Sequence, residues 1–265
     1  MTVVLGISLL VPIPAASQGR VPGYESIKPL GPNGEVIPRR AIPRAANGKP
    51  DFTGVWAGPG YSHQVGPYDT DIPRIARIDP KAFPPFKPGG ESFFFQPHNG
   101  DLAHDDPTSV CLPSGISRLI FTFLPQQWIQ APDHMVVIYE SQHFPRVIPI
   151  GAPNRPHSDF DGEKTWMGDA IGWWEGATFV IDTIGIREWQ WDVSGRWHSD
   201  QLHMIERLTY TDPMTVRYDM TFDDPAILTK PLTPQTFGMK LHPTWRIMEH
   251  VCEENNRCEA GKCSQ

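Results

Sequence analysis

The chain has 265 residues, of which 20% are charged, and its formal net charge is -7 at pH 7. This composition is typical of a globular protein. Because the chain is acidic and has no block of Lys or Arg, we do not expect it to bind nucleic acid. The 29 prolines and 23 glycines argue against long helices and in favour of many turns.

The N-terminal 50 residues show no periodic pattern of a folded element. An apolar run over residues 3–14 ends in small residues, which is typical of a secretory signal peptide over residues 1–17; a frayed apolar terminus is the alternative. We therefore expect a secreted or periplasmic protein. Residues 18–50 are rich in Pro, Gly and Arg, as in an extended leader. No other stretch approaches the ~18 apolar residues of a membrane span, so no transmembrane segment is expected.

Residues 51–256 are predicted to form a single β domain. Its first strand signal covers residues 51–56, and residues 58–110 then form an irregular insertion that is again rich in Pro and Gly. A long irregular stretch inside a compact domain is usually functional, so we expect a lid or one wall of a site there. Short helices that the pattern does not reveal are the alternative.

After Cys111 the pattern becomes regular. Runs typical of strands, separated by turn signals, cover residues 126–131, 134–141, 144–150, 169–174, 177–184, 201–211, 214–223 and 244–252. About eight or nine strands joined by tight turns form a meander, which loses its exposed edges by closing into a barrel. We therefore predict an all-β fold, an antiparallel meander closed around an apolar pocket for one small ligand. A two-sheet sandwich is the alternative.

The four cysteines of an exported chain predict two disulfides, for which three connectivities are possible. We predict that Cys111 pairs with Cys252, and that Cys258 pairs with Cys263 to close a small loop in the tail over residues 257–265. Zinc binding is the competing interpretation. The spacing lacks the usual C-x2-C knuckle and no His lies within the cluster, which disfavours zinc.

The densest group of polar residues lies at the start of one predicted strand. Strand alternation places Asp200 and Glu206 on one face and His203 and Arg207 on the other. Because His203 and Glu206 point to opposite faces, a metal site made of His198, His203 and Glu206 is disfavoured. A network of structural ion pairs around Glu206 and Arg207 is the alternative to a catalytic role.

Two further charged residues are candidates for chemistry. Arg146 lies in the middle of an apolar strand, and Glu140 ends the preceding strand, so a cross-strand ion pair is favoured. A guanidinium directed into a pocket would instead hold an anion or oxyanion. Asp169 begins another strand, where it satisfies backbone N–H groups or, if it lies near His203, orients that imidazole as a general base.

No nucleophile elbow, phosphate-binding loop or dinucleotide-binding motif occurs in the sequence, so we expect no cofactor. Aromatic residues are abundant, and Trp174 is interpreted as a core plug or a pocket wall.

Six segments together resemble a large, mostly uncharacterised family of exported bacterial proteins. They read PDFTGVW (50–56), CLPSGISR (111–118), WMGDAIGWWEGATFVIDT (166–183), LHMIER (202–207), DP (224–225) and EHVCEENN (249–256). Members of that family carry G-D-S-x-G-x-W-E-G-D-T-L-V-V, L-H-x-x-E-R and E-Y-x-C-x-E-x-N motifs in the same order. This chain departs from them at Ala170, where Ser is usual, and at Ala177, where Asp is usual.

The resemblance implies export and a lipocalin-like barrel, since lipocalins also carry Gly-x-Trp in their first strand, as Gly54-Val55-Trp56 does here. It implies no established reaction. The positions that it singles out are Arg146, Asp169, Trp174, Glu175, His203, Glu206 and Arg207.

The expected function is that of a secreted, cofactor-independent hydrolase, lyase or isomerase acting on a lipophilic or aromatic small molecule such as an ether. His203, assisted by Asp169 or Asp200, would act as general acid/base, and Arg146 would stabilise negative charge. The residues expected around the small molecule are Trp56, Glu140, Trp166, Trp174 and Arg207. The alternatives are a non-catalytic binding protein of lipocalin type and, third, a metallohydrolase.

Overall fold

The computed structural model describes residues 41–57, 84–120, 122, 124–152, 162–191, 196–233, 237–254, 258–259 and 262–263. The predicted signal peptide, most of the predicted leader and residues 58–83 of the insertion lie outside this set. Among the residues that are described, no helix has the length and hydropathy of a membrane span.

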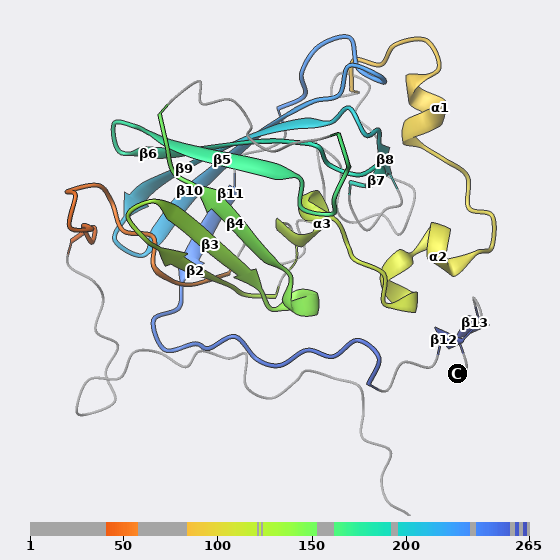
Figure 1. Cartoon of the computed structure of the whole chain (residues 1–265). Coiled ribbons are helices and arrows are strands. Elements are labelled where there is room, and N and C mark those ends of the chain that lie inside the picture. The colour runs from red at the N-terminus through yellow and green to blue at the C-terminus, as the bar shows by residue number, and fades with distance from the viewer. Residues whose placement is uncertain are drawn as a thin grey trace, which may run out of the picture.

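A large antiparallel sheet dominates the fold (Figure 1). Within the described residues it has nine strands in the order β4-β3-β2-β1-β11-β10-β9-β6-β5. Their bounds are β1 (Gly54–Ala57), β2 (Gln126–Gln130), β3 (His134–Tyr139), β4 (Pro145–Pro149), β5 (Asp169–Glu175), β6 (Thr178–Ile184), β9 (His203–Asp212), β10 (Thr215–Asp223) and β11 (Phe237–Leu241). The sheet curls until it is nearly closed, which confirms the predicted all-β barrel.

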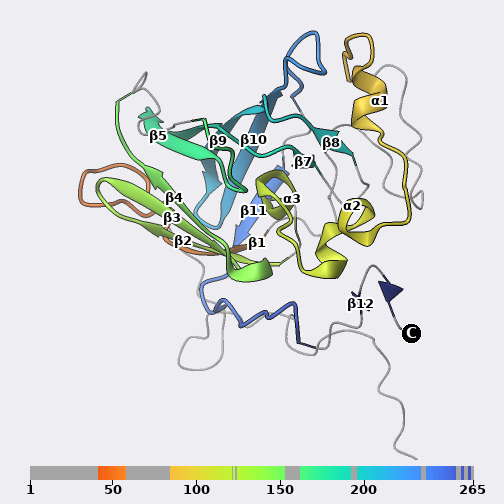
Figure 2. The same cartoon turned by 45° about the vertical axis from the view of Figure 1, so that its right-hand side comes forward.

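The remaining elements are short. They are α1 (Gly90–Phe94), α2 (Leu102–Asp105), η1 (Pro107–Val110), α3 (Ile116–Ile120), η2 (Ser141–His143) and the two-stranded pairs β7 (Trp189–Gln190) with β8 (Trp197–His198) and β12 (Cys258–Glu259) with β13 (Lys262–Cys263). The described part of the predicted irregular insertion, residues 84–110, thus contains single helical turns joined by irregular chain. Figure 2 shows α1, α2 and α3 on one side of the barrel.

The two edge strands meet at a seam with few backbone hydrogen bonds. Neighbouring strands alternate in direction, so with nine strands the edge strands β4 and β5 run the same way. They join through a parallel bridge between Ile150 and Gly172, where Gly151 N donates to Gly172 O at 2.9 Å. Closure at this β4–β5 seam therefore depends on side chains more than on a ladder.

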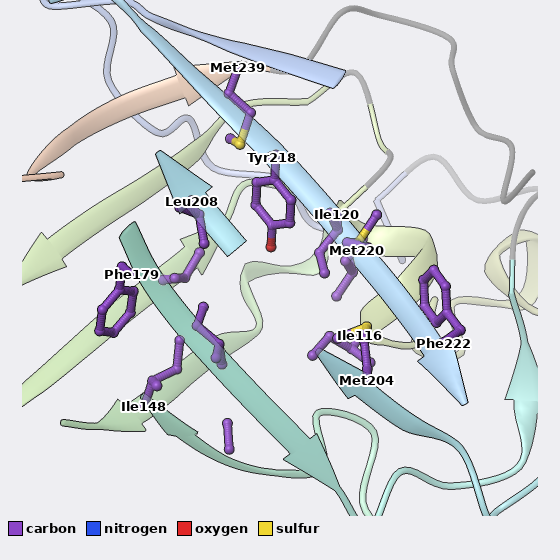
Figure 3. Packing of buried hydrophobic residues seen from close by; sticks show 14 of the residues in the cluster. Ile116, Ile120, Ile148, Phe179, Met204, Leu208, Tyr218, Met220, Phe222 and Met239 are labelled. Carbon is purple, nitrogen blue, oxygen red and sulfur yellow. The ribbon is translucent and has the colours of Figure 1, made fainter. Parts of the chain in front are cut away.

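Strand alternation fills the barrel with large apolar side chains. Along β9 buried and more exposed positions alternate, and the buried ones face inward. Figure 3 shows the resulting core, in which inward residues from several strands meet. They include Ile148, Phe179, Met204, Leu208, Tyr218, Met220, Phe222 and Met239.

Both ends of the barrel are closed by packed groups. At one end the ring of Phe52 stacks on Tyr210 at 4.9 Å and on Trp174 at 5.9 Å between centroids; we call these three residues the Phe52 plug. At the other end α3 buries Ile116, Leu119 and Ile120, and Figure 3 places Ile116 beside Met204.

The disulfide between Cys111 and Cys252 is confirmed, with the two Cα atoms 5.5 Å apart. It ties the segment before α3 to the C-terminal chain. The backbones of Cys258 and Cys263 are paired between β12 and β13. Their side chains lie outside the described set, so the second disulfide stays a prediction.

The last predicted strand, residues 244–252, is wrong. That segment is irregular, and the final strand of the barrel is β11, which the pattern did not indicate. Residues 244–252 hydrogen bond to the β3–β4 connection and not to a neighbouring strand: Met248 N donates to Glu140 Oε2 at 2.9 Å, and Gln142 N donates to His250 Nδ1 at 3.3 Å. An alternating pattern forms a β-strand only where the edge of a sheet is available to pair with it.

We predict that Gly172→Ala lowers the free energy of unfolding by about 1–3 kcal/mol, the usual cost of overpacking a core. A Cβ at Gly172 would lie 2.5 Å from Phe179 Cζ and 3.1 Å from Ile148 Cγ2, between the two sides of the seam. Gly238→Ala is the matched strand control, because its Cβ meets only Thr215 Cγ2 at 3.6 Å. Urea unfolding of both variants checks this, and equal stabilities would contradict it.

Candidate functional site

A buried ion pair crosses the interior of the barrel. Arg146 points inward from β4, and its Nη1 and Nη2 donate to Glu206 Oε1 at 2.9 Å and Oε2 at 2.5 Å. Nη2 also donates to Thr183 Oγ1 at 2.6 Å. The side chains of Arg146 and Glu206 are 2% and 0% exposed. The guanidinium reaches β6 and β9 past β5, whose inward residues opposite Thr183 and Ile181 are the small Ala170 and Gly172.

Two tyrosines complete this polar group. The Tyr218 hydroxyl donates to Glu206 Oε1, and Figure 3 shows it pointing into the barrel. Burial, and then the charge of Glu206, raises the pKa of Tyr218 well above its usual value. Burial raises the pKa of Tyr139 to about 12, while Arg146 opposes that rise. Both tyrosines are therefore neutral hydroxyl groups at physiological pH. We call Tyr139, Arg146, Thr183, Glu206 and Tyr218 the interior network.

Two atoms of the interior network lack hydrogen-bond partners among the described residues. They are the Tyr139 hydroxyl and Arg146 Nε, and both are fully buried. The Arg146 guanidinium lowers the pKa of Tyr139 through its charge and through a hydrogen-bonding interaction with the hydroxyl, so the two groups are neighbours. No contact between them has the distance and angle of a normal hydrogen bond. Buried polar atoms are nearly always partnered, so these two donors are exceptions among the described residues.

The interior network differs from the sequence-based expectation for Arg146. In place of the predicted pair with Glu140, Arg146 pairs with Glu206, because residue 146 faces inward in register with Val137. Glu140 lies beyond the end of β3 and accepts from Met248 N. Burial lowers and the Glu206 carboxylate raises the pKa of Arg146, and the net shift is upward. Its charge is thus balanced within the protein.

His203 lies on the outer face of the barrel wall, as alternation predicts. Its Nε2 is 2.7 Å from Asp182 Oδ1, and its side chain is 39% exposed. The hydrogen bond to Asp182 raises the pKa of His203, burial opposes this, and the charges of Asp182 and Asp223 add to it. The carboxylate that contacts His203 is therefore Asp182, and not Asp169 or Asp200 as predicted.

The structure separates the predicted acid/base residues from Arg146. Asp169 begins β5 on the outer face, since its neighbour Ala170 faces Thr183 inside. Asp200 is exposed in the turn before β9, and its charge helps to raise the pKa of Glu188, which burial raises most. His203, Asp169 and Asp200 therefore do not face the interior network.

Arg207 also lies outside. Its Nη1 donates to Glu175 Oε2 at 2.6 Å, and Trp173 Nε1 donates to Glu175 Oε1 at 3.0 Å. Arg207 thus forms a surface ion pair, which is the alternative to a catalytic role that the sequence analysis considered.

The tryptophans predicted to surround a small molecule occupy different places. Trp174 belongs to the Phe52 plug. Trp56 is buried inside the barrel and donates from Nε1 to Phe52 O at 2.8 Å. Trp166 packs edge-on against Trp189 at 4.6 Å, outside the nine-stranded sheet, and Arg187 lies over its ring at 4.8 Å.

His198 is buried at the α3 end of the core. Its Nδ1 lies 2.9 Å from Ser199 O, so Nδ1 carries the proton of the neutral ring, and Nε2 has no partner among the described residues. Burial lowers the pKa of His198 to about 4, against the hydrogen bond to Ser199. Trp191 contributes to the same core, with ring centroids 6.3 Å apart.

The three residues considered for a metal site have separate surroundings: His198 is buried at the α3 end, His203 is on the outer face of the barrel wall and Glu206 is inside the barrel. In the described ranges no group of three or more His, Cys, Asp or Glu side chains is arranged to hold a metal ion.

Tyr139, Thr183, Tyr218 and Asp182 were not singled out from the sequence. A signal existed for the tyrosines, since each is the one residue with a hydroxyl on an inward, otherwise apolar face of its strand: Met135 and Val137 precede Tyr139, and Val216 and Met220 flank Tyr218. The contact between His203 and Asp182 depends on the register of β6 against β9, which no local pattern contains.

Comparisons with protein-family models, with curated proteins and with solved structures found no match. The resemblance to a family of exported proteins, and the export that it implies, therefore stay predictions from the motifs.

We predict that His198 makes the protein less stable in mild acid. Its folded-state pKa of about 4 lies below the unfolded value of about 6.5, so the unfolded state binds more protons between these limits. Stability is then lost as the pH falls from 6.5 to 4, by up to about 3 kcal/mol. His198→Asn keeps a donor for Ser199 O and should flatten this pH dependence in urea unfolding.

The control is His134→Asn, at a half-exposed histidine next to Asp133. It should leave the slope between pH 6.5 and 4 as in the wild type. If His198→Asn also leaves that slope unchanged, His198 takes up a proton in the folded state and the prediction is wrong.

Proposed function

We propose that this protein binds a small lipophilic molecule inside the barrel. The observation that carries the proposal is the pair of buried atoms, the Tyr139 hydroxyl and Arg146 Nε, without partners among the described residues. A few polar groups in an apolar, enclosed surrounding are typical of small-molecule sites, where they orient the ligand. Small barrels hold one such ligand.

The end closed by α3 is the proposed entrance. Tyr139 is in register with Gln126, the first residue of β2, and β2 follows α3 in the chain. α3 is short, and Gly115 precedes it at a φ of 79°. Its buried apolar residues Ile116, Leu119 and Ile120 are contacts that an apolar ligand can replace, while Ser117 and Arg118 hydrogen bond to Gln190 outside the nine-stranded sheet.

We expect the neutral fluorophore N-phenyl-1-naphthylamine to bind saturably, with one molecule per chain and increased emission. Met220 faces inward in register with Glu206, so Met220→Trp should fill the site and weaken binding at least tenfold. Thr221→Trp places the same indole on the outer face of β10 and is the matched control.

A fluorescence titration of the three proteins measures this. Circular dichroism first establishes that both variants are folded. Lack of saturation in the wild type, or equal affinity of all three proteins, would contradict binding inside the barrel.

A second candidate function is general acid/base catalysis on the outer wall, which the contact between His203 and Asp182 favours. A carboxylate that orients an imidazole and raises its pKa is a common device for proton transfer near neutral pH. This keeps the expected hydrolytic chemistry but moves it away from Arg146.

We predict that wild-type protein hydrolyses 4-nitrophenyl acetate faster than buffer does, and that His203→Gln lowers this rate about 100-fold. His134→Gln is the control, because His134 also contacts a carboxylate, Asp133, at 2.7 Å on the surface. Release of 4-nitrophenolate is the readout. A wild-type rate equal to that of buffer, or equal losses in the two variants, rules the dyad out as a catalyst.

A further inference from the structure

The charge of the interior network is already balanced. Arg146 binds Glu206 through two hydrogen bonds, and both side chains are almost completely removed from solvent. A buried ion without a counter-ion is strongly disfavoured. An anionic ligand would add an unpaired negative charge beside Glu206, and a cationic ligand would add a positive charge beside Arg146.

The carboxylate of Glu206 is also occupied. Oε1 accepts from Arg146 Nη1 and from the Tyr218 hydroxyl, and Oε2 accepts from Arg146 Nη2. It therefore has little capacity for a donor group of a ligand. The Thr183 hydroxyl accepts from the same guanidinium.

What the interior network leaves open is a need for an acceptor. Arg146 Nε–H can only donate, and the Tyr139 hydroxyl can donate as well. Both atoms are without partners among the described residues. An oxygen with two lone pairs can accept from both groups at once, as backbone and ligand carbonyl oxygens commonly do.

We infer that the ligand in the barrel is a neutral lipophilic molecule with one carbonyl-type oxygen, as in a ketone, ester or amide, held by Arg146 Nε and the Tyr139 hydroxyl. This inference rests on the proposed function of binding inside the barrel. It reverses the role expected for Arg146, which now recognises a neutral acceptor and not an anion.

The test compares three ligands of the same ring system as competitors of N-phenyl-1-naphthylamine: indane, 1-indanone and indane-1-carboxylate. We expect 1-indanone to bind at least tenfold more tightly than the other two. In Tyr139→Phe the preference for 1-indanone over indane should fall to threefold or less. Tyr210→Phe is the control, because that hydroxyl donates to Asp51 O in the region of the Phe52 plug, and it should keep the tenfold preference.

The outcomes separate the two proposals. If the fluorophore binds but indane competes as well as 1-indanone, or the carboxylate binds best, the ligand class is wrong and binding in the barrel stands. If the fluorophore does not bind, both proposals fail.

A measurement without ligand tests the same atoms. Removing an unpartnered buried hydroxyl relieves its desolvation, so Tyr139→Phe should raise the urea midpoint, whereas Tyr218→Phe should lower it by removing a donor from Glu206. A lower midpoint for Tyr139→Phe would show that its hydroxyl has a partner within the protein, which overturns the inference.

Discussion

The ion pair between Arg146 and Glu206 is the constraint on which the barrel depends. An odd number of alternating strands brings β4 and β5 together in parallel, with little backbone pairing. Arg146 reaches from β4 over β5 to β6 and β9, and so connects the two sides of the seam. A buried pair of this kind adds little net stability over apolar residues, yet losing one partner is costly. What the hydrogen bonds of Arg146 show directly is a link from β4 to β6 and β9 across the seam.

The same pair determines what the interior can recognise. By using both oxygens of Glu206 and both terminal nitrogens of the guanidinium, it balances the charge inside the barrel and leaves Nε as the one guanidinium nitrogen without an acceptor among the described residues. Tyr139 adds a second donor next to it. The proposed selectivity for a neutral acceptor thus follows from how the barrel is closed. Two buried polar atoms without partners destabilise the folded state, and an oxygen atom of a bound ligand would reduce this cost by accepting hydrogen bonds from them.

The barrel wall divides the titratable residues into two sets with separate roles. Adjacent residues of β9 belong to different sets: Glu206 is inside and Arg207 is outside, paired with Glu175. His203 joins the outer set through Asp182. Because about one strand thickness of protein lies between them, a proton transferred at His203 cannot serve a ligand held by Arg146. Binding and acid/base chemistry are therefore alternatives at different places.

Local pattern determined much of this protein. Period-two alternation predicted most strands of the barrel and the opposite directions of His203 and Glu206, because the side-chain period of a strand is a property of its backbone. The turn residues Glu175-Gly176 predicted the hairpin between β5 and β6. The grouping of the cysteines favoured the pair of Cys111 and Cys252 among three possible connectivities, and the structure confirms this pair. Tertiary structure alone decided the partners: Glu206 for Arg146, Asp182 for His203, and the irregular course of residues 244–252. Partners depend on strand register and on which edges meet, and these are settled between segments far apart in the chain, where no local pattern reaches.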